Sequence, residues 1–221
     1  MAAHPYYPRS IVLAGFSPQL WSMPAILGVF SVAVFVVVGG TLLLSSGNKR
    51  LTALDRATLA WWIATGLIHL VIEGSYAIAP TFYQTTSANF LHDLWKEYSK
   101  GDSRYATRDS FIVSMETVTA FAWGPGSFLV AYALATDAPY RHAAQLLVSL
   151  GQLYGDVLYF GTCYLEGFVH SDPGWLYFYG YFVFMNAIWI VVPSLLIGQS
   201  WQAISAAFAS LKPAKVRSKR A

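Results

Sequence analysis

The stretch from Trp61 to Pro80, WWIATGLIHLVIEGSYAIAP, constrains the fold more than any other part of the chain. Its length and apolar character suit a helix that crosses the hydrocarbon core of a bilayer, which takes about 20 residues. It nevertheless carries His69 and Glu73, which lie four residues apart and therefore on one face of a helix. An ionised group at such depth costs about 2.5–3.5 kcal/mol on insertion scales. The stretch therefore predicts a membrane helix whose two ionisable groups serve chemistry or ligand binding.

The composition of the whole chain agrees with a membrane protein. Of the 221 residues 56% are hydrophobic and only 11% are charged, whereas soluble domains carry about 25% charged residues. The net charge of +3 is too small to indicate a nucleic-acid partner. Cys163 is the single cysteine, which excludes an internal disulfide and a cysteine-rich metal site. The N-terminus lacks a basic segment with a small-residue cleavage site, so we expect no removable signal peptide.

Apolar runs of spanning length divide the chain. We predict an all-α membrane protein, a bundle of five transmembrane helices, at about residues 24–45, 58–80, 111–135, 143–163 and 176–198. We expect one transmembrane domain over residues 1–200 and a basic cytosolic tail over residues 201–221. The segment from Thr81 to Ser110 is the one long polar loop, and no internal repeat is visible.

The distribution of basic residues predicts the orientation in the membrane. With five spans, one side collects nine Lys and Arg residues, namely Lys49, Arg50, Arg56, Arg141 and five in the tail, and the other collects Arg9, Lys96, Lys100, Arg104 and Arg108. The positive-inside rule then predicts a cytosolic C-terminus and a lumenal N-terminus. The tail ends in RSKRA, which is close to a dibasic retrieval signal of the endoplasmic reticulum. A solvated basic tail held by lipid charge explains it equally well.

Polar residues in four of these predicted helices fall at similar depth. A rise of about 1.5 Å per residue puts six side chains between about 8 and 15 Å from the lumenal surface: Glu73, Glu116, Asp156, Thr119, His69 and Asn186. Ionisable groups in a helix bundle turn away from lipid. We therefore predict that these side chains share one polar cavity.

Each of these residues also has a structural explanation. His69 alone is typical of a satisfied interior histidine, and Glu73 then only orients it. Glu116 can pair with a backbone carbonyl freed by Pro125. For Asp156 we favour a structural role, because Gln145, Ser149, Gln152 and Asp156 form one stripe that can pack on another helix. On spacing alone a transmembrane tryptophan such as Trp189 more often packs or faces lipid.

Two other chemistries are weakly supported. His69, Glu73 and Glu116 are a thin ligand set for a metal, and no second histidine is placed to help, so we predict no metal site. No Gly-x-Ser-x-Gly sequence occurs, which argues against a serine hydrolase.

The motifs around these residues resemble the emopamil-binding protein family of sterol Δ8-Δ7 isomerases, with some segments closer to plant-type members. The matching segments follow the family order and cover most of the chain from His4 to about Pro193: HPYYP, GLIHLVIEG (66–74), LWKEYSKGDSRY (94–105), SMETVTA (114–120), GQLYGDVLYF (151–160) and YFVFMNAIW (181–189). The first span and the tail depart most from the family.

The resemblance implies a five-helix protein of the endoplasmic reticulum membrane that moves a ring double bond of a Δ8-sterol to Δ7. It implies no cofactor, a homodimer, and a pocket that binds lipophilic amines as inhibitors. The residues implied to line the site are His69, Glu73, Glu116, Thr119, Asn186 and Trp189. A loop motif adds Tyr98, Asp102, Arg104 and Tyr105 to the predicted substrate-binding residues.

We interpret His69 with Glu73 as one proton relay and Glu116 as the second proton-transfer group. Trp189 is expected to stabilise a carbocation, with Asn186 and Thr119 holding the polar network. Two alternatives remain open at this point. A non-catalytic sterol- or amine-binding protein of the sigma-2 receptor type has the same architecture, and a proton-coupled transporter uses similar carboxyls.

Overall fold

The computed structural model describes residues 4–211, and in this part of the chain it contains helices and no strands. Four helical stretches are long and apolar enough to cross a membrane: Met23–Ser45, Ala53–Ile78, Ser110–Thr136 and Leu176–Ser210. They match four of the five predicted spans within a few residues at most boundaries. The basic end of the tail, residues 212–221, lies outside the described residues, and residues 201–210 form the last turns of the final helix.

The remaining predicted span, at residues 143–163, is also a helix, α8 (Arg141–Leu165), but it is less apolar than the other four. Its polar stripe is the reason, because Gln145, Ser149, Gln152 and Asp156 are all buried against the rest of the bundle. Gln145 donates hydrogen bonds to the Leu196 carbonyl, 3.2 Å away, and to two polar side chains of α9. The stripe thus faces protein, and several large apolar residues of α8, such as Leu147 and Leu150, face outward.

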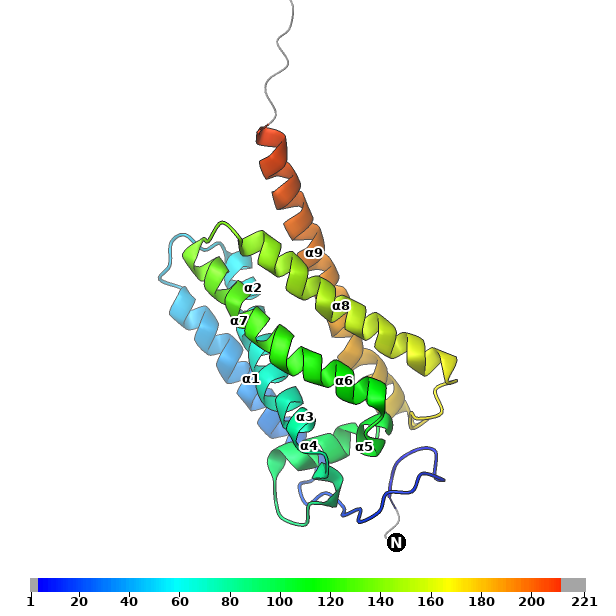
Figure 1. Ribbon diagram of the computed structural model, residues 1–221. Coiled ribbons are helices and arrows are strands. Elements are labelled where there is room, and N and C mark those ends of the chain that lie inside the picture. Colours follow the sequence, from blue (N-terminus) through cyan, green and yellow to red (C-terminus); the bar gives the residue numbers. More distant parts are fainter. Residues whose placement is uncertain (1–3, 212–221) are drawn as a thin grey trace, which may run out of the picture.

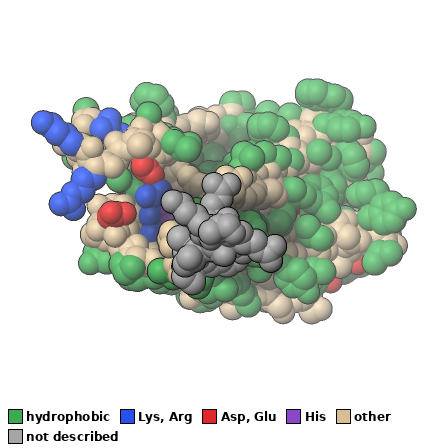
Figure 2. All heavy atoms as spheres, turned by 90° about the horizontal axis from the view of Figure 1, so that it is seen from above, with side chains coloured by type: hydrophobic (Ala, Val, Ile, Leu, Met, Phe, Trp, Pro, Cys, Tyr) green, Lys and Arg blue, Asp and Glu red, His purple; other side chains and the backbone are tan. Residues whose placement is uncertain are grey.

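The long helices run side by side (Figure 1). They are α1 (Met23–Ser45), α2 (Ala53–Leu67) continued by α3 (Gly74–Ile78), α6 (Ser110–Val118) continued by α7 (Gly124–Thr136), α8, and α9 (Met185–Ser210). Figure 1 shows α9 extending beyond the other helices at one end of the bundle. Viewed from that end, apolar side chains cover most of the surface, and Lys and Arg gather at one edge (Figure 2).

Three of the long helices contain π-helical turns, in which the backbone N–H bonds to the carbonyl five residues earlier. They are η1 (Ile68–Glu73), η3 (Thr119–Trp123) and η4 (Leu176–Phe184). The Gly74 N–H bonds to the His69 carbonyl, and the Gly124 N–H bonds to the Thr119 carbonyl. Such turns are rare and are frequently found at functional sites. Pro125, expected as a kink, occupies the first turn of α7 directly after η3.

The opposite end of the bundle is closed by the segment of residues 81–110, which the sequence predicts to be a polar loop. It contains η2 (Phe82–Gln84), α4 (Phe90–Tyr98) and α5 (Arg104–Thr107). In Figure 1 these elements and the N-terminal residues cover this end. Asp93 of α4 accepts hydrogen bonds from the backbone N–H groups of Leu20 and Trp21, and Tyr6 donates to the Lys96 carbonyl. The polar loop is therefore a folded cap.

Two hydrophobic cores divide the bundle along its length. One contains Trp62 of α2, Val148 of α8 and Leu196 of α9, and the other is mainly aromatic and contains Tyr76, Tyr159 and Phe182, among others. Four helices each cross both cores. On each of them the predicted polar residues lie between its two core segments, as Gln152 and Asp156 do between Val148 and Tyr159 on α8. The polar layer is thus enclosed by apolar packing at both ends.

Gly151 allows α8 to approach η3 at this layer. A Cβ atom added at Gly151 would lie 2.3 Å from Cζ2 of Trp123, whereas one added at Gly161 of the same helix would meet nothing within 4 Å. We expect Gly151→Ala to lower the free energy of unfolding by about 1–3 kcal/mol, because the overlap forces a shift in a packed core. Gly161→Ala is the matched control and should stabilise or be neutral, because alanine favours the helix. Thermal unfolding of the purified protein in detergent measures both, and equal effects would contradict the packing argument.

Candidate functional site

One cavity lies at the polar layer between the two cores. The empty space inside it and at its open mouth is about 940 Å³. Much of its wall is apolar, with Phe30 of α1, Ile72 of η1 and Met115 of α6 among the lining residues. The polar lining residues are His69, Glu73, Tyr98, Tyr105, Glu116, Thr119, Gln152, Asp156 and Asn186, and Trp189 joins them. Such a cavity suits a hydrophobic ligand on which a few polar groups act.

The imidazole of His69 is held by protein on both edges and on one face. Its Nδ1 atom lies 2.7 Å from Oε2 of Glu73, as the four-residue spacing predicted, and its Nε2 atom lies 3.0 Å from Nε2 of Gln152. The ring of Trp189 packs against it, with centroids 4.9 Å apart and planes 31° apart. His69 is only 2% exposed. The imidazole is therefore fixed in position and orientation.

Glu116 reaches the same cavity from α6. The hydroxyl of Tyr105 donates a hydrogen bond to its Oε1 atom at 2.7 Å, while its Oε2 atom is buried and has no hydrogen-bond partner among the described residues. Tyr105 in turn stacks on Trp95, with centroids 5.2 Å apart. Glu116 thus bonds to a tyrosine. The structural explanation considered above, in which it pairs with a backbone carbonyl freed by Pro125, is not what the structure shows. One oxygen of Glu116 remains available for a ligand.

The remaining predicted residues on the cavity wall are held by weaker or local bonds. The amide of Asn186 donates to the Phe182 carbonyl at 2.7 Å, and the Tyr98 hydroxyl lies 3.5 Å from its Oδ1 atom. The Thr119 hydroxyl donates to the Met115 carbonyl of its own helix at 2.8 Å. These residues line the cavity wall, and their hydrogen bonds do not form a wider network.

Two further polar residues line the cavity wall: Gln152 was not a predicted site residue, and Asp156 was predicted to share the cavity but was given a structural role. Gln152 and Asp156 both come from the α8 stripe. Asp156 was expected to close that stripe against another helix, but its buried Oδ2 atom has no partner among the described residues. The signal was present in the sequence, since both residues continue the polar face of α8, Asp156 at the predicted depth of Glu73 and Gln152 at that of His69.

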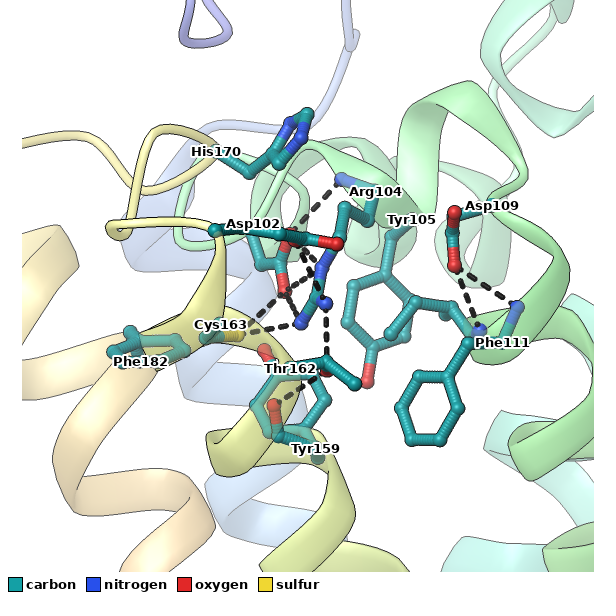
Figure 3. A network of polar contacts seen from close by, with 12 residues as sticks. Asp102, Arg104, Tyr105, Asp109, Phe111, Tyr159, Thr162, Cys163, His170 and Phe182 are labelled. Carbon is teal, nitrogen blue, oxygen red and sulfur yellow. Dashed lines mark hydrogen bonds and ion pairs between the residues drawn. The ribbon is translucent and has the colours of Figure 1, made fainter.

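Asp102 and Arg104, in contrast, do not line the cavity, although the resemblance implied that they bind substrate. Figure 3 shows the guanidinium of Arg104 between Asp102 and the end of α8. Arg104 donates to Asp102 through Nη2 at 2.8 Å and to Oγ1 of Thr162 through Nη1 at 2.9 Å, and Nη1 also reaches Glu166 at 3.2 Å. Arg104 begins the single turn of α5, so its side chain and that of Tyr105 leave the chain in different directions.

Arg104 connects the cap to the bundle, because it bonds to Asp102 within the cap and to Thr162 and Glu166 at the end of α8. Burial alone would lower the pKa of Arg104, but the hydrogen bonds and charge of Asp102 outweigh burial and raise the pKa above its ordinary value. The guanidinium therefore stays charged while it is 2% exposed. Because Tyr105 is the next residue along the chain, the pair holds the backbone from which the Tyr105 hydroxyl reaches Glu116.

The cavity carries no dense set of metal ligands. Within residues 4–211 no group of three or more His, Cys, Asp or Glu side chains is arranged to hold a metal ion. His69 and Glu73 are instead paired with one another and Glu116 with Tyr105, whereas the buried Oδ2 atom of Asp156 has no partner among the described residues.

Comparison with known proteins reveals close relatives. The family model EXPERA (EXPanded EBP superfamily) matches residues 90–200. The chain is 41% identical to a probable 3-beta-hydroxysteroid-Delta(8),Delta(7)-isomerase of Oryza sativa, over 93% of this chain and 94% of that protein. It is 44% identical to the 3-beta-hydroxysteroid-Delta(8),Delta(7)-isomerase of Mus musculus, over 98% and 96%. A protoglabretal synthase of Ailanthus altissima is 38% identical over 97% and 99%.

The ion pair of the cap can be tested by its effect on stability. We expect Arg104→Met to lower the free energy of unfolding by about 3–5 kcal/mol, because it leaves the buried Asp102 carboxylate unpaired. Arg50→Met, at an exposed position, is the control and should change stability by less than about 0.5 kcal/mol. Thermal unfolding in detergent measures the difference. Equal losses from both variants would show that the pair does not anchor the cap.

Proposed function

The chain belongs to the EBP family and is a sterol Δ8-Δ7 isomerase, and we propose that the cavity between its two cores is the active site. One observation carries this proposal. Two carboxyl side chains from different helices, Glu73 and Glu116, line the same largely apolar cavity, and each is hydrogen-bonded through one oxygen to a ring side chain. A flat hydrophobic substrate between them would meet an acid and a base.

Moving an isolated double bond requires two proton transfers and no net oxidation. Protonation of carbon 9 uses the electron pair of the Δ8 bond to form the new C–H bond and leaves a tertiary cation at carbon 8. Loss of a proton from carbon 7 then returns an electron pair to form the Δ7 bond. Because electrons are neither gained nor lost, the reaction needs no redox cofactor.

We assign His69 with Glu73 as one proton relay and Glu116 as the second proton-transfer group, with either carboxyl as the donor. Trp189, on the cavity wall beside His69, is the residue suited to stabilise the cation, since an indole face attracts a cation by about 0.5–2 kcal/mol. Asn186, Thr119 and Tyr98 complete the polar wall. Tyr105 orients Glu116, and Asp102 and Arg104 act through Tyr105.

The apolar wall has a second role in this proposal. A carbocation reacts with water to give an alcohol, so the cavity must exclude water while the cation exists. The same arrangement explains why lipophilic amines should inhibit, because an ammonium group placed like the cation would meet the carboxylates of Glu73 and Glu116.

We further propose that α8 is a fifth transmembrane helix and that the protein resides in the endoplasmic reticulum membrane as a homodimer. The N-terminus would then be lumenal and the C-terminus cytosolic. In support, α8 runs beside α9 for much of its length, its polar stripe is buried, and several large apolar side chains such as Leu147 and Leu158 are exposed on its outer face.

The proton relay can be tested with variants that keep the shape of the side chain. We expect Glu73→Gln and Glu116→Gln each to lower turnover of a Δ8-sterol by about 100-fold or more, because a carboxamide cannot exchange the proton. Asp137→Asn, in the exposed turn between α7 and α8, is the control and should retain wild-type turnover. Turnover is measured as deuterium incorporated into the Δ7 product in deuterated water.

The same assay separates the enzyme from its alternative. A sterol- or amine-binding protein of the sigma-2 receptor type would bind the sterol and incorporate no deuterium. Near-wild-type turnover by both carboxamide variants would refute the relay while leaving the isomerase activity intact.

If α8 crosses the membrane, its two ends lie on opposite sides. Cysteines introduced as Asp137→Cys and Asp172→Cys should react with a membrane-impermeant maleimide from opposite faces of sealed microsomes. Cys163 is buried and gives little background. Labelling of both from the same face would exclude α8 as a span.

A further inference from the structure

Gln152 of α8 occupies the edge of His69 that Glu73 leaves free. Its Nε2 atom lies 3.0 Å from Nε2 of His69, a residue of η1 that is 83 positions earlier in the chain. We propose that Gln152 is a positioning residue of the reaction: it holds Nε2 of His69 as a hydrogen-bond acceptor, so that His69 acts on the sterol only through Glu73. This inference rests on the proposed function.

The hydrogen-bonding capacities of the two groups lead to one tautomer. The amide nitrogen of glutamine can only donate, so the Nε2 atom of His69 that faces it must offer a lone pair. The ring proton is then on Nδ1, from which it is donated to Oε2 of Glu73 at 2.7 Å. His69 is therefore the neutral Nδ1–H imidazole, with neither nitrogen left for the sterol.

At this end of the cavity, Oε1 of Glu73 has no hydrogen-bond partner among the described residues. The Glu73 side chain is 12% exposed and lines the cavity, whereas His69 behind it is 2% exposed. When Oε1 gives its proton to an alkene carbon, the electron pair of the O–H bond stays on the carboxylate. The Nδ1–H group of His69 already donates to that carboxylate and stabilises the charge as it forms.

The packing around Gln152 maintains this arrangement. Gly151 lets α8 approach Trp123, and a Cβ atom at Gly124 would lie 3.3 Å from the Leu70 nitrogen and 3.5 Å from Cβ of His69, so η1, η3 and α8 meet closely here. Trp189 fixes the plane of the imidazole. The Oε1 atom of Gln152 is buried and has no partner among the described residues, so the contact with His69 is the hydrogen bond that orients the amide.

The test compares two glutamines of the same stripe. Gln152→Met keeps the volume and removes the donor, so kcat should fall about tenfold while KM stays within about twofold, because a single hydrogen bond contributes up to about a factor of ten. Gln145→Met is the matched control. Gln145 donates more hydrogen bonds but lies outside the cavity wall, so its loss should lower stability and leave kcat unchanged.

A spectroscopic measurement on the wild-type protein tests the tautomer directly. In protein labelled with ¹⁵N-histidine, the His69 signals are those missing from the spectrum of His69→Gln. We expect the Nε2 resonance of His69 at the shift of an unprotonated ring nitrogen in the wild type, and a mixture of tautomers in Gln152→Met. Protonation at Nε2 in the wild type would overturn the inference.

The outcomes separate the inference from the proposed function. A wild-type protein that isomerises no Δ8-sterol would overturn the proposed function. An active wild type whose Gln152→Met variant keeps both its kcat and its histidine tautomer would overturn the role of Gln152 alone. A fall in kcat of the same size in Gln145→Met would show that the loss reflects general destabilisation, and would also overturn it.

Discussion

The burial of imidazole and carboxyl groups inside an apolar helix bundle is the constraint on which the structure depends. A buried polar group without a partner costs about 1–3 kcal/mol, and an ionised one costs more. In an apolar membrane interior these partners must come from the protein itself. His69 finds Glu73 on its own helix and Gln152 on α8, and Glu116 finds Tyr105 in the cap. These pairs join η1 to α8 and α6 to the cap.

The two hydrophobic cores and the cap hold these polar pairs around a defined cavity. The cores pack the helices tightly on either side of the polar layer, and the π-helical turns lie on three of the long helices at or next to that layer. The Arg104–Asp102 pair anchors the cap to the end of α8, and the cap supplies Tyr105. The ion pair outside the cavity is thus one residue along the chain from the tyrosine that bonds to Glu116.

The proposed chemistry follows from how the two carboxyls differ in their surroundings. Glu73 is backed by an imidazole whose second nitrogen is engaged by an amide, and Glu116 by a phenol stacked on Trp95. Each keeps one oxygen for the cavity. Two proton-transfer groups of this kind on the wall of one largely apolar cavity can add a proton to one ring carbon and remove a different proton from another, while the apolar wall excludes water.

The sequence by itself determined the helical class, five helical stretches within a few residues at most boundaries, and the His69–Glu73 pair, because hydrophobic run length and four-residue spacing are local properties. It also indicated that Glu116, Thr119 and Asn186 share a depth. Only the tertiary structure decided that Tyr105 bonds to Glu116, that Gln152 bonds to His69, and that Asp102 and Arg104 stand outside the cavity wall. These contacts join residues from different elements, and their geometry depends on how closely the helices and the cap approach one another. Packing at glycines such as Gly151 sets that distance, and no local sequence pattern encodes it.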